Sequence, residues 1–200
     1  MAYNEFSYPS VLGLLGLTLR EGALFEAAQM QAVPPDFVAR LAEGVMLAQA
    51  VNTEKARSEW IIAPVLLEIW RTAPQPFGLF SGAELKAGKD ARLSGVCDFL
   101  LTREPIQTVI RTPIVTVVEA KNENLRAGLG QCIAEMVAAQ WMNETQGEAN
   151  VTIYGVVTTG SLWQFARLQE TTVQLEAREY TLGDLGKIFA YFRQFVINSM

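Results

Sequence analysis

The sequence predicts an α/β protein in which a mixed central sheet is flanked by helices. Segments with apolar residues at helical spacing lie on both sides of short β-branched or strongly apolar runs, which are typical of buried strands. The chain has 200 residues, of which 50% are hydrophobic and 18% are charged, and this composition is enough for a sizeable core. We therefore expect strands and helices that share one hydrophobic interior.

Two helices are expected before the sheet. Residues 36–49 carry apolar side chains at helical spacing after two prolines, and Asp36 supplies an acidic residue at the helix start. A second helix begins at Asn52 or Thr53 and runs to about residue 70. Pro64 kinks this second helix or marks a restart, because proline cannot donate a backbone hydrogen bond.

The rest of the chain alternates between strands and helices. The runs at 93–102 and 113–120 are almost continuously apolar, as expected for strands that are buried on both faces of a sheet. Gly160 marks a turn between two later strands. The expected strands are 77–83, 93–102, 113–120, 151–158, 161–168 and 173–179, and the expected helices are 128–142 and 182–197.

We expect one domain over residues 1–200, because no repeat, low-complexity tract or long linker divides the chain. Its core should cover about 52–160, with an N-terminal extension at 1–51 and a C-terminal helix at about 182–197. No segment approaches the roughly 18 apolar residues of a membrane span, so a cytoplasmic protein without a membrane partner is expected. Cys97 and Cys132 lie in apolar surroundings, which predicts buried reduced thiols.

The absence of histidine narrows the possible chemistry. It excludes Ser-His-Asp triads, Cys-His pairs and histidine-bound zinc sites. A metal held by carboxylate oxygens would be a hard cation, Mg²⁺ or Mn²⁺. The net charge of −5 argues against a protein that coats nucleic acid, so any contact with nucleic acid should be local.

Two expected strands carry a carboxylate where an apolar side chain would be usual. Asp98 lies in the run at 93–102 and Glu119 lies in the run at 113–120. A lone buried carboxylate is unfavourable, so each needs a cation or a hydrogen-bond donor. Because side chains alternate along a strand, Glu119 and Lys121 leave the same face and place an acid beside an amine.

Asp98, followed some twenty positions later by Glu119-Ala120-Lys121, resembles the Asp and Glu-x-Lys motif of the PD-(D/E)XK, restriction-endonuclease-like nuclease superfamily. The resemblance spans about residues 54–158. Glu59 matches the acidic residue of the first core helix, and Gln131 matches a glutamine that many members carry. The residue before Asp98 is a cysteine, where the motif has proline.

This resemblance implies a restriction-endonuclease-like fold and metal-dependent hydrolysis of DNA phosphodiesters, with Mg²⁺ as the cofactor and Mn²⁺ as a substitute. Asp98, Glu119 and the carbonyl of Ala120 would bind the metal, and Glu59 would bind a second metal or orient a metal-bound water. Lys121 would orient the attacking water and stabilise charge in the transition state. Gln131 would position Lys121 or the nucleophile.

Other interpretations of these residues stay open. The acids and Lys121 also fit a structural ion pair at a sheet edge. Glu59 also fits a surface helix position that pairs with Lys55, and Gln131 also fits a solvated position. The rival functions are a catalytically silent binding or assembly module with the nuclease fold and a hydrolase of a small phosphorylated substrate. A homodimer would suit two-fold symmetric DNA, although nothing in the sequence requires one.

Overall fold

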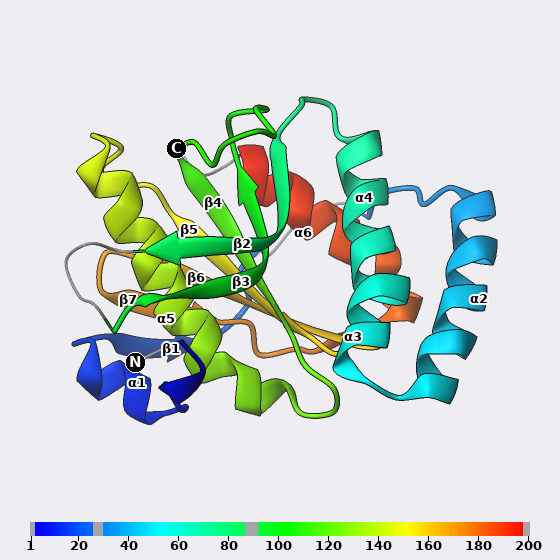
Figure 1. The fold of residues 1–200 in the computed structure, drawn as a ribbon, viewed down its shortest axis with the longest axis horizontal. Helices are drawn as coiled ribbons and strands as arrows, with labels where there is room; N and C mark the ends of the chain where they lie inside the picture. The colour runs from blue at the N-terminus through cyan, green and yellow to red at the C-terminus, as the bar shows by residue number, and fades with distance from the viewer. Residues whose placement is uncertain (1–2, 26–29, 87–91, 198–200) are drawn as a thin grey trace.

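The computed structural model describes residues 3–25, 30–86 and 92–197. In these ranges eight strands form a mixed sheet, with the order β1-β7-β6-β5-β4-β3-β2 and β8 beside β6 (Figure 1). Strand pairs β4–β5 and β1–β7 are parallel, and the other pairs are antiparallel. The predicted α/β class with a mixed central sheet and flanking helices is confirmed.

The strands come from nearly the whole length of the chain. Every residue of β4 is buried, as the sequence indicated for a strand covered on both faces. The sheet extends beyond the expected core of 52–160, because β1 and the last three strands belong to it. The strands are β1 Thr18–Glu21, β2 Gly78–Lys86, β3 Ser94–Thr102, β4 Ile114–Ala120, β5 Ile153–Thr158, β6 Leu162–Gln169, β7 Thr172–Leu175 and β8 Tyr180–Thr181.

The helices at 35–51, 54–72, 125–145 and 185–197 occupy the positions that the apolar spacing predicted, whereas the helix at 10–14 was not expected. None in the described ranges is both long enough and apolar enough to cross a bilayer. The α-helices are α1 Ser10–Leu14, α2 Pro35–Val51, α3 Glu54–Arg57, α4 Ala63–Thr72, α5 Leu125–Thr145 and α6 Leu185–Ile197; the π-helical segment η2 is Ser58–Ile62, and short 3-10 helices lie at Tyr3–Glu5 and Leu182–Asp184.

Helices α5 and α6 cover opposite faces of the sheet. On β5, the ring of Tyr154 stacks on Phe195 of α6, with the ring centroids 4.2 Å apart. The next residue, Gly155, lies against α5, where a Cβ atom would be 2.4 Å from the sulfur of Met136. Neighbouring strand residues point to opposite faces, so the central strands lie between the two helices. The buried free thiols of Cys97 and Cys132 belong to this core, as expected.

Helix α3, segment η2 and helix α4 follow one another without a break, and Pro64 lies at the end of the π-helical turn. Proline has no N–H, so the regular α-helical hydrogen bond to the carbonyl of Trp60 cannot form. Helix α2 approaches this carbonyl at Gly44, where a Cβ atom would lie 2.3 Å from the Trp60 oxygen. The kink or restart expected at Pro64 is therefore a π-helical turn, and α2 packs against it.

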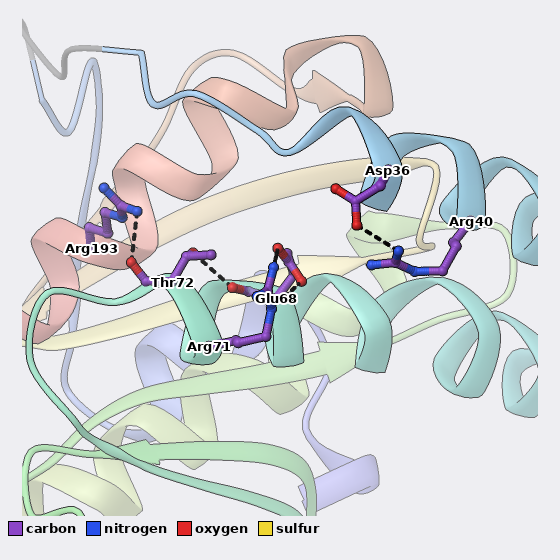
Figure 2. Close-up of polar contacts among 6 residues, drawn as sticks. All are labelled: Asp36, Arg40, Glu68, Arg71, Thr72 and Arg193. Atoms are coloured by element: carbon purple, nitrogen blue, oxygen red, sulfur yellow. Dashed lines mark hydrogen bonds and ion pairs between the residues drawn. The ribbon is translucent and has the colours of Figure 1, made fainter.

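The C-terminal end of α4 is bound to α6 (Figure 2). Arg193 of α6 donates a hydrogen bond of 2.9 Å to the carbonyl of Thr72. Glu68, which is only 5% exposed, accepts two hydrogen bonds from Arg71 one turn later. Figure 2 also shows the exposed pair between Asp36 and Arg40 on α2. The bond from Arg193 links α4 to α6, whereas the other two pairs lie within single helices.

Several parts of the fold differ from the expectation: the strand expected at 173–179 ends at Leu175, and residues 180–181 form the separate strand β8. Strand β1 pairs with β7, although its sequence Thr-Leu-Arg-Glu has no apolar alternation. Helix α5 begins at Leu125, three residues before the expected start, because the side chain of Asn124 caps it by accepting a hydrogen bond from the Arg126 amide. The sequence Lys-Ala-Gly-Lys-Asp at 86–90 also predicts a turn, and residues 87–91 lie outside the described residues.

We expect Gly128→Ala to destabilise the protein by roughly 1–3 kcal/mol, the usual effect of an extra methyl group in a packed interior. A Cβ atom at Gly128 would lie 2.7 Å from Cγ1 of Val157 and 2.9 Å from Cγ of Lys121, so α5 could not keep its distance from the sheet. Urea unfolding followed by circular dichroism measures the effect. Gly13→Ala is the matched control, because a Cβ atom there meets nothing within 4 Å. Equal stability of the two variants would contradict this packing.

Candidate active site

The candidate site lies where β3 and β4 separate. Toward the site, Phe99 and Val118 are the last residues of β3 and β4 that pair with each other. On the other side of β3, the ladder with β2 omits the pair of Gly82 and Asp98, and Gly82 has a φ of +62°. Figure 1 shows β2 and β3 bending away from the rest of the sheet. Asp98 therefore lies at an interruption in the pairing on both sides of its strand.

Asp98 accepts a hydrogen bond from β4 that a backbone carbonyl of β3 would accept in a continuous ladder. Its Oδ2 atom accepts a hydrogen bond of 2.8 Å from the amide of Ala120. The amide of the next residue, Lys121, donates to the carbonyl of Thr158 on the opposite side, at 2.8 Å. Successive amides of an extended strand point in opposite directions, so Ala120 needs an acceptor on the side of β3. Asp98 thus places a carboxylate against the end of β4.

Glu119 and Lys121 form an ion pair on the same face of the chain. The ammonium of Lys121 donates to Oε1 of Glu119 and also lies 3.4 Å from Oε1 of Gln131, at the long limit of a hydrogen bond. The Glu119 side chain is 1% exposed and that of Lys121 is 21% exposed. The pair therefore lies at the boundary between the core and solvent.

Burial is the main influence on the charges of these groups. It raises the pKa of Glu119 to about 7, with a further contribution from the charge of Asp98 and opposition from Lys121. Burial also raises the pKa of Asp98, against the stabilising hydrogen bond from Ala120. For Lys121, burial lowers the pKa, but the hydrogen bond and charge of Glu119 outweigh this effect, so the pKa is raised. The ammonium therefore stays charged at neutral pH.

The structure adds a carboxylate that sequence reasoning missed. Glu135 of α5 has no exposed surface, and its Oε1 atom accepts a hydrogen bond of 3.1 Å from the amide nitrogen of Gln131. Burial and the charge of Glu119 hold the pKa of Glu135 well above its usual range. The signal was present in the sequence, since residues four apart share one helix face and this acid interrupts the apolar run at 132–138.

Asp98, Glu119, Lys121 and Gln131 come together as expected, but Glu59 does not join them. Glu59 pairs with Lys55 at 2.8 Å, and its side chain is 52% exposed. Positions two apart on a helix face opposite sides, and Arg57, two residues before Glu59, is the residue that reaches the site. Glu59 lies on the far side, where it borders a cavity with α2 that is lined by Phe37, Arg40, Leu41, Gly44, Leu47, Glu59, Trp60 and Pro64.

Glu54 is the acid of this helix that influences the site. Its charge contributes to raising the pKa of both Glu119 and Lys121. Glu54 and Arg57 are three residues apart and share one helix face. Glu54, and not Glu59, therefore shares a helix face with Arg57, and Glu59 as a metal ligand stays a prediction.

Arg57 connects three segments around the site. Its guanidinium donates to the side chain of Asn122 at 3.1 Å, to the carbonyl of Thr159 at 3.2 Å and to the side chain of Asn52 at 3.1 Å. Asn122 directly follows Lys121, and Thr159 follows β5. The planar fork of arginine suits such multiple contacts, so Arg57 fixes the chain just beyond Lys121.

The two strand carboxylates fit a hard divalent cation. Buried Oε2 of Glu119 has no hydrogen-bond partner among the described residues, and the bond from Ala120 uses one oxygen of Asp98. The described ranges contain no group of three or more His, Cys, Asp or Glu side chains that could hold a metal. Mg²⁺ needs only one or two carboxylates, because it keeps several of its waters. The expected ligands Asp98, Glu119 and the Ala120 carbonyl suit Mg²⁺, whereas Glu59 forms an ion pair with Lys55.

A cavity of about 420 Å³ begins beside the loop that follows Lys121. Three of its lining residues are glutamates, and the guanidinium of Arg126 lies 5.6 Å from the centre of the Tyr8 ring. The lining is Tyr8, Glu21, Glu123, Asn124, Leu125, Arg126, Leu129, Leu162, Gln164, Leu175 and Glu179. Such a lining repels phosphate, so the cavity is a poor place for a nucleic-acid backbone.

No protein-family model matches the sequence, and no curated protein sequence gives a significant match.

We expect the free energy of unfolding to fall as pH rises from about 4.5 to about 7. Glu119 has a pKa of about 7 in the folded protein and an ordinary value of 4.5, so the folded state binds more protons between these values. Asp98 and Glu135 are raised as well and act in the same direction. Glu119→Gln should make the dependence shallower, as measured by urea unfolding across this range. A variant with the wild-type slope would show that Glu119 titrates normally.

Proposed function

We propose that this protein is a metal-dependent nuclease of the PD-(D/E)XK type that hydrolyses DNA phosphodiesters with Asp98, Glu119 and Lys121. One observation carries the proposal: a lysine ammonium is held by a buried glutamate, and a second carboxylate lies against the same strand end. An isolated structural ion pair would not require Asp98 beside it, where the like charges raise the pKa of Glu119.

The residues divide the proposed chemistry between them. Mg²⁺, when bound by Asp98, Glu119 and the Ala120 carbonyl, would stabilise the charge that develops on the phosphodiester and lower the pKa of a bound water. Lys121 would hold the attacking water and stabilise negative charge through its ammonium, whose position Glu119 and Gln131 fix. Arg57 would keep the segment after Lys121 in place through Asn122.

We expect only local contact with DNA, because the charge distribution does not favour binding along a long duplex. Lys86 pairs with Glu84 at 2.9 Å, and Arg126 lies over the Tyr8 ring beside the acidic cavity. Counterion release needs several free basic groups along the phosphate backbone. A strand end or a short exposed stretch therefore suits this surface better than a long duplex, and the homodimer remains a prediction.

A catalytically silent module is the second candidate, and one observation favours it. Glu119 is 1% exposed and one of its oxygens already binds the Lys121 ammonium, so the cation must reach an almost closed carboxylate. A fold that had lost catalysis could retain such a pair as a structural contact. Metal binding distinguishes the two candidates, because only the enzyme requires it.

Asp98→Asn is expected to abolish Mg²⁺ and Mn²⁺ binding and to lower DNA cleavage by more than roughly 100-fold, beyond the usual loss at supporting residues. The asparagine oxygen can still accept the Ala120 hydrogen bond, so the strand end should keep its structure. Calorimetry measures metal binding, and linear, supercoiled and single-stranded DNA serve as substrates. Asp36→Asn is the control, because Asp36 is an exposed acid paired with Arg40.

Loss of both properties in Asp98→Asn alone would support the nuclease. Metal binding without cleavage in the wild type would move the search to small phosphorylated substrates. No metal binding in the wild type would contradict the proposal and favour the silent module.

A paired substitution on the first helix compares the two acidic positions, Glu54 and Glu59. Glu54→Gln is expected to weaken metal affinity or cleavage by about 10-fold, within the range found for residues around a metal site. Glu59→Gln removes the same charge from the other side of the helix and should change neither. Metal titration of both variants measures these effects. A larger effect of Glu59→Gln would support Glu59 as the residue that binds the metal or orients its water.

A further inference from the structure

Glu135 is a buried acid with an unusually sparse set of partners. Its side chain has no exposed surface, and its Oε2 atom has no hydrogen-bond partner among the described residues. The elements around it bring further acids rather than a direct counter-ion: the charges of Glu119 on β4 and Asp98 on β3 act on it unfavourably, and Lys121 acts favourably. Such burial destabilises a folded protein, so an apolar residue would serve packing better.

Among the described residues Glu135 makes one side-chain hydrogen bond, through Oε1. An ionised carboxylate only accepts, and a protonated carboxyl accepts at the same oxygen when its proton lies on Oε2, the oxygen without a partner. Gln131 therefore turns its NH₂ group toward Glu135, at 3.1 Å. The other end of the amide is then a carbonyl oxygen, and this oxygen lies 3.4 Å from the Lys121 ammonium. With the amide reversed, an NH₂ group would face the ammonium and repel it.

We propose that Glu135 is a positioning residue that fixes the orientation of the Gln131 amide and thereby holds the Lys121 ammonium between two oxygen atoms. One oxygen belongs to Glu119 and the other to Gln131. The consequence for catalysis rests on the proposed nuclease function, whereas the effect on Lys121 does not. The order of contacts is Glu135 to Gln131 to Lys121, and it joins the inner side of α5 to the end of β4.

The test uses Glu135→Gln, which keeps the shape of the side chain but can either donate or accept. In Glu135→Gln the Gln131 amide is no longer held in one orientation, so its oxygen faces the Lys121 ammonium only part of the time. The pKa of Lys121 should therefore fall. The chain has only five lysines, so the Cε signal of Lys121 can be followed by carbon NMR during a pH titration and assigned with Lys121→Arg. This measurement needs neither metal nor DNA.

The same substitution in a Gln131→Leu variant separates the effect of amide orientation from the effect of losing the Glu135 charge. Gln131→Leu removes the amide, so Glu135→Gln in that background can act on Lys121 only through charge. We expect a clearly larger pKa change in the wild-type background than in the Gln131→Leu background. Equal changes would overturn the proposal, because they would show a direct electrostatic effect of Glu135. The exposed control Glu148→Gln should leave the Lys121 signal unchanged.

Stability and kinetics complete the test. Glu135→Gln removes a buried acid, so the variant should be at least as stable as the wild type in urea, and a weakened site cannot then be attributed to unfolding. If the protein cleaves DNA, kcat should fall by about 10-fold with little change in KM, as for other supporting residues. A variant with unchanged Lys121 pKa and unchanged kcat would contradict the positioning role, while an absence of cleavage in the wild type would bear on the proposed function alone.

Discussion

The burial of acids at the end of β4 is the constraint on which the rest of the site depends. Glu119 lies almost wholly inside the protein, and the Lys121 ammonium is its charged partner. Removing two charges from water is unfavourable, and their attraction compensates only when further hydrogen bonds hold them in place. The neighbours of this pair are therefore selected for the hydrogen bonds and the close packing that they provide.

Three surrounding elements provide these hydrogen bonds and this close packing. Helix α5 comes close enough for Gln131 to reach Lys121 only because Gly128 lacks a side chain at the contact with the sheet. Strand β3 supplies Asp98, which replaces a ladder hydrogen bond at the end of β4. Helix α3 supplies Arg57, whose three hydrogen bonds hold the segment after the lysine. The bonds of Arg57 to Asn122 and Thr159 span 65 and 102 residues of the chain, so the geometry of the site depends on the whole fold.

These contacts also explain which parts could be predicted from the sequence. Asp98 and Glu119 were recognisable because a carboxylate within an apolar strand needs a partner, and alternation along the strand placed Lys121 beside Glu119. The role of Glu59 stays a prediction, because motif spacing does not give the phase of a helix and the π-helical turn further alters this one. Glu135 is not part of the motif, and only the helix face that it shares with Gln131 points to it. Strand β1 is held by pairing with a distant strand, which its own four residues do not encode.

The electrostatics of the site also constrain the order of events in the proposed nuclease. The charge of Asp98 acts on Glu119 and Glu135, the charge of Glu119 acts on Glu135, and Lys121 opposes these effects. A phosphodiester would meet net repulsion there until a cation reduces the negative charge. Burial, with a contribution from the charge of Asp98, raises the pKa of Glu119 to about 7, so a proton and a metal would compete for its carboxylate near neutral pH. An acidic protein can therefore act on a phosphate substrate without a basic surface, provided that the cation binds first and makes the site attractive to it.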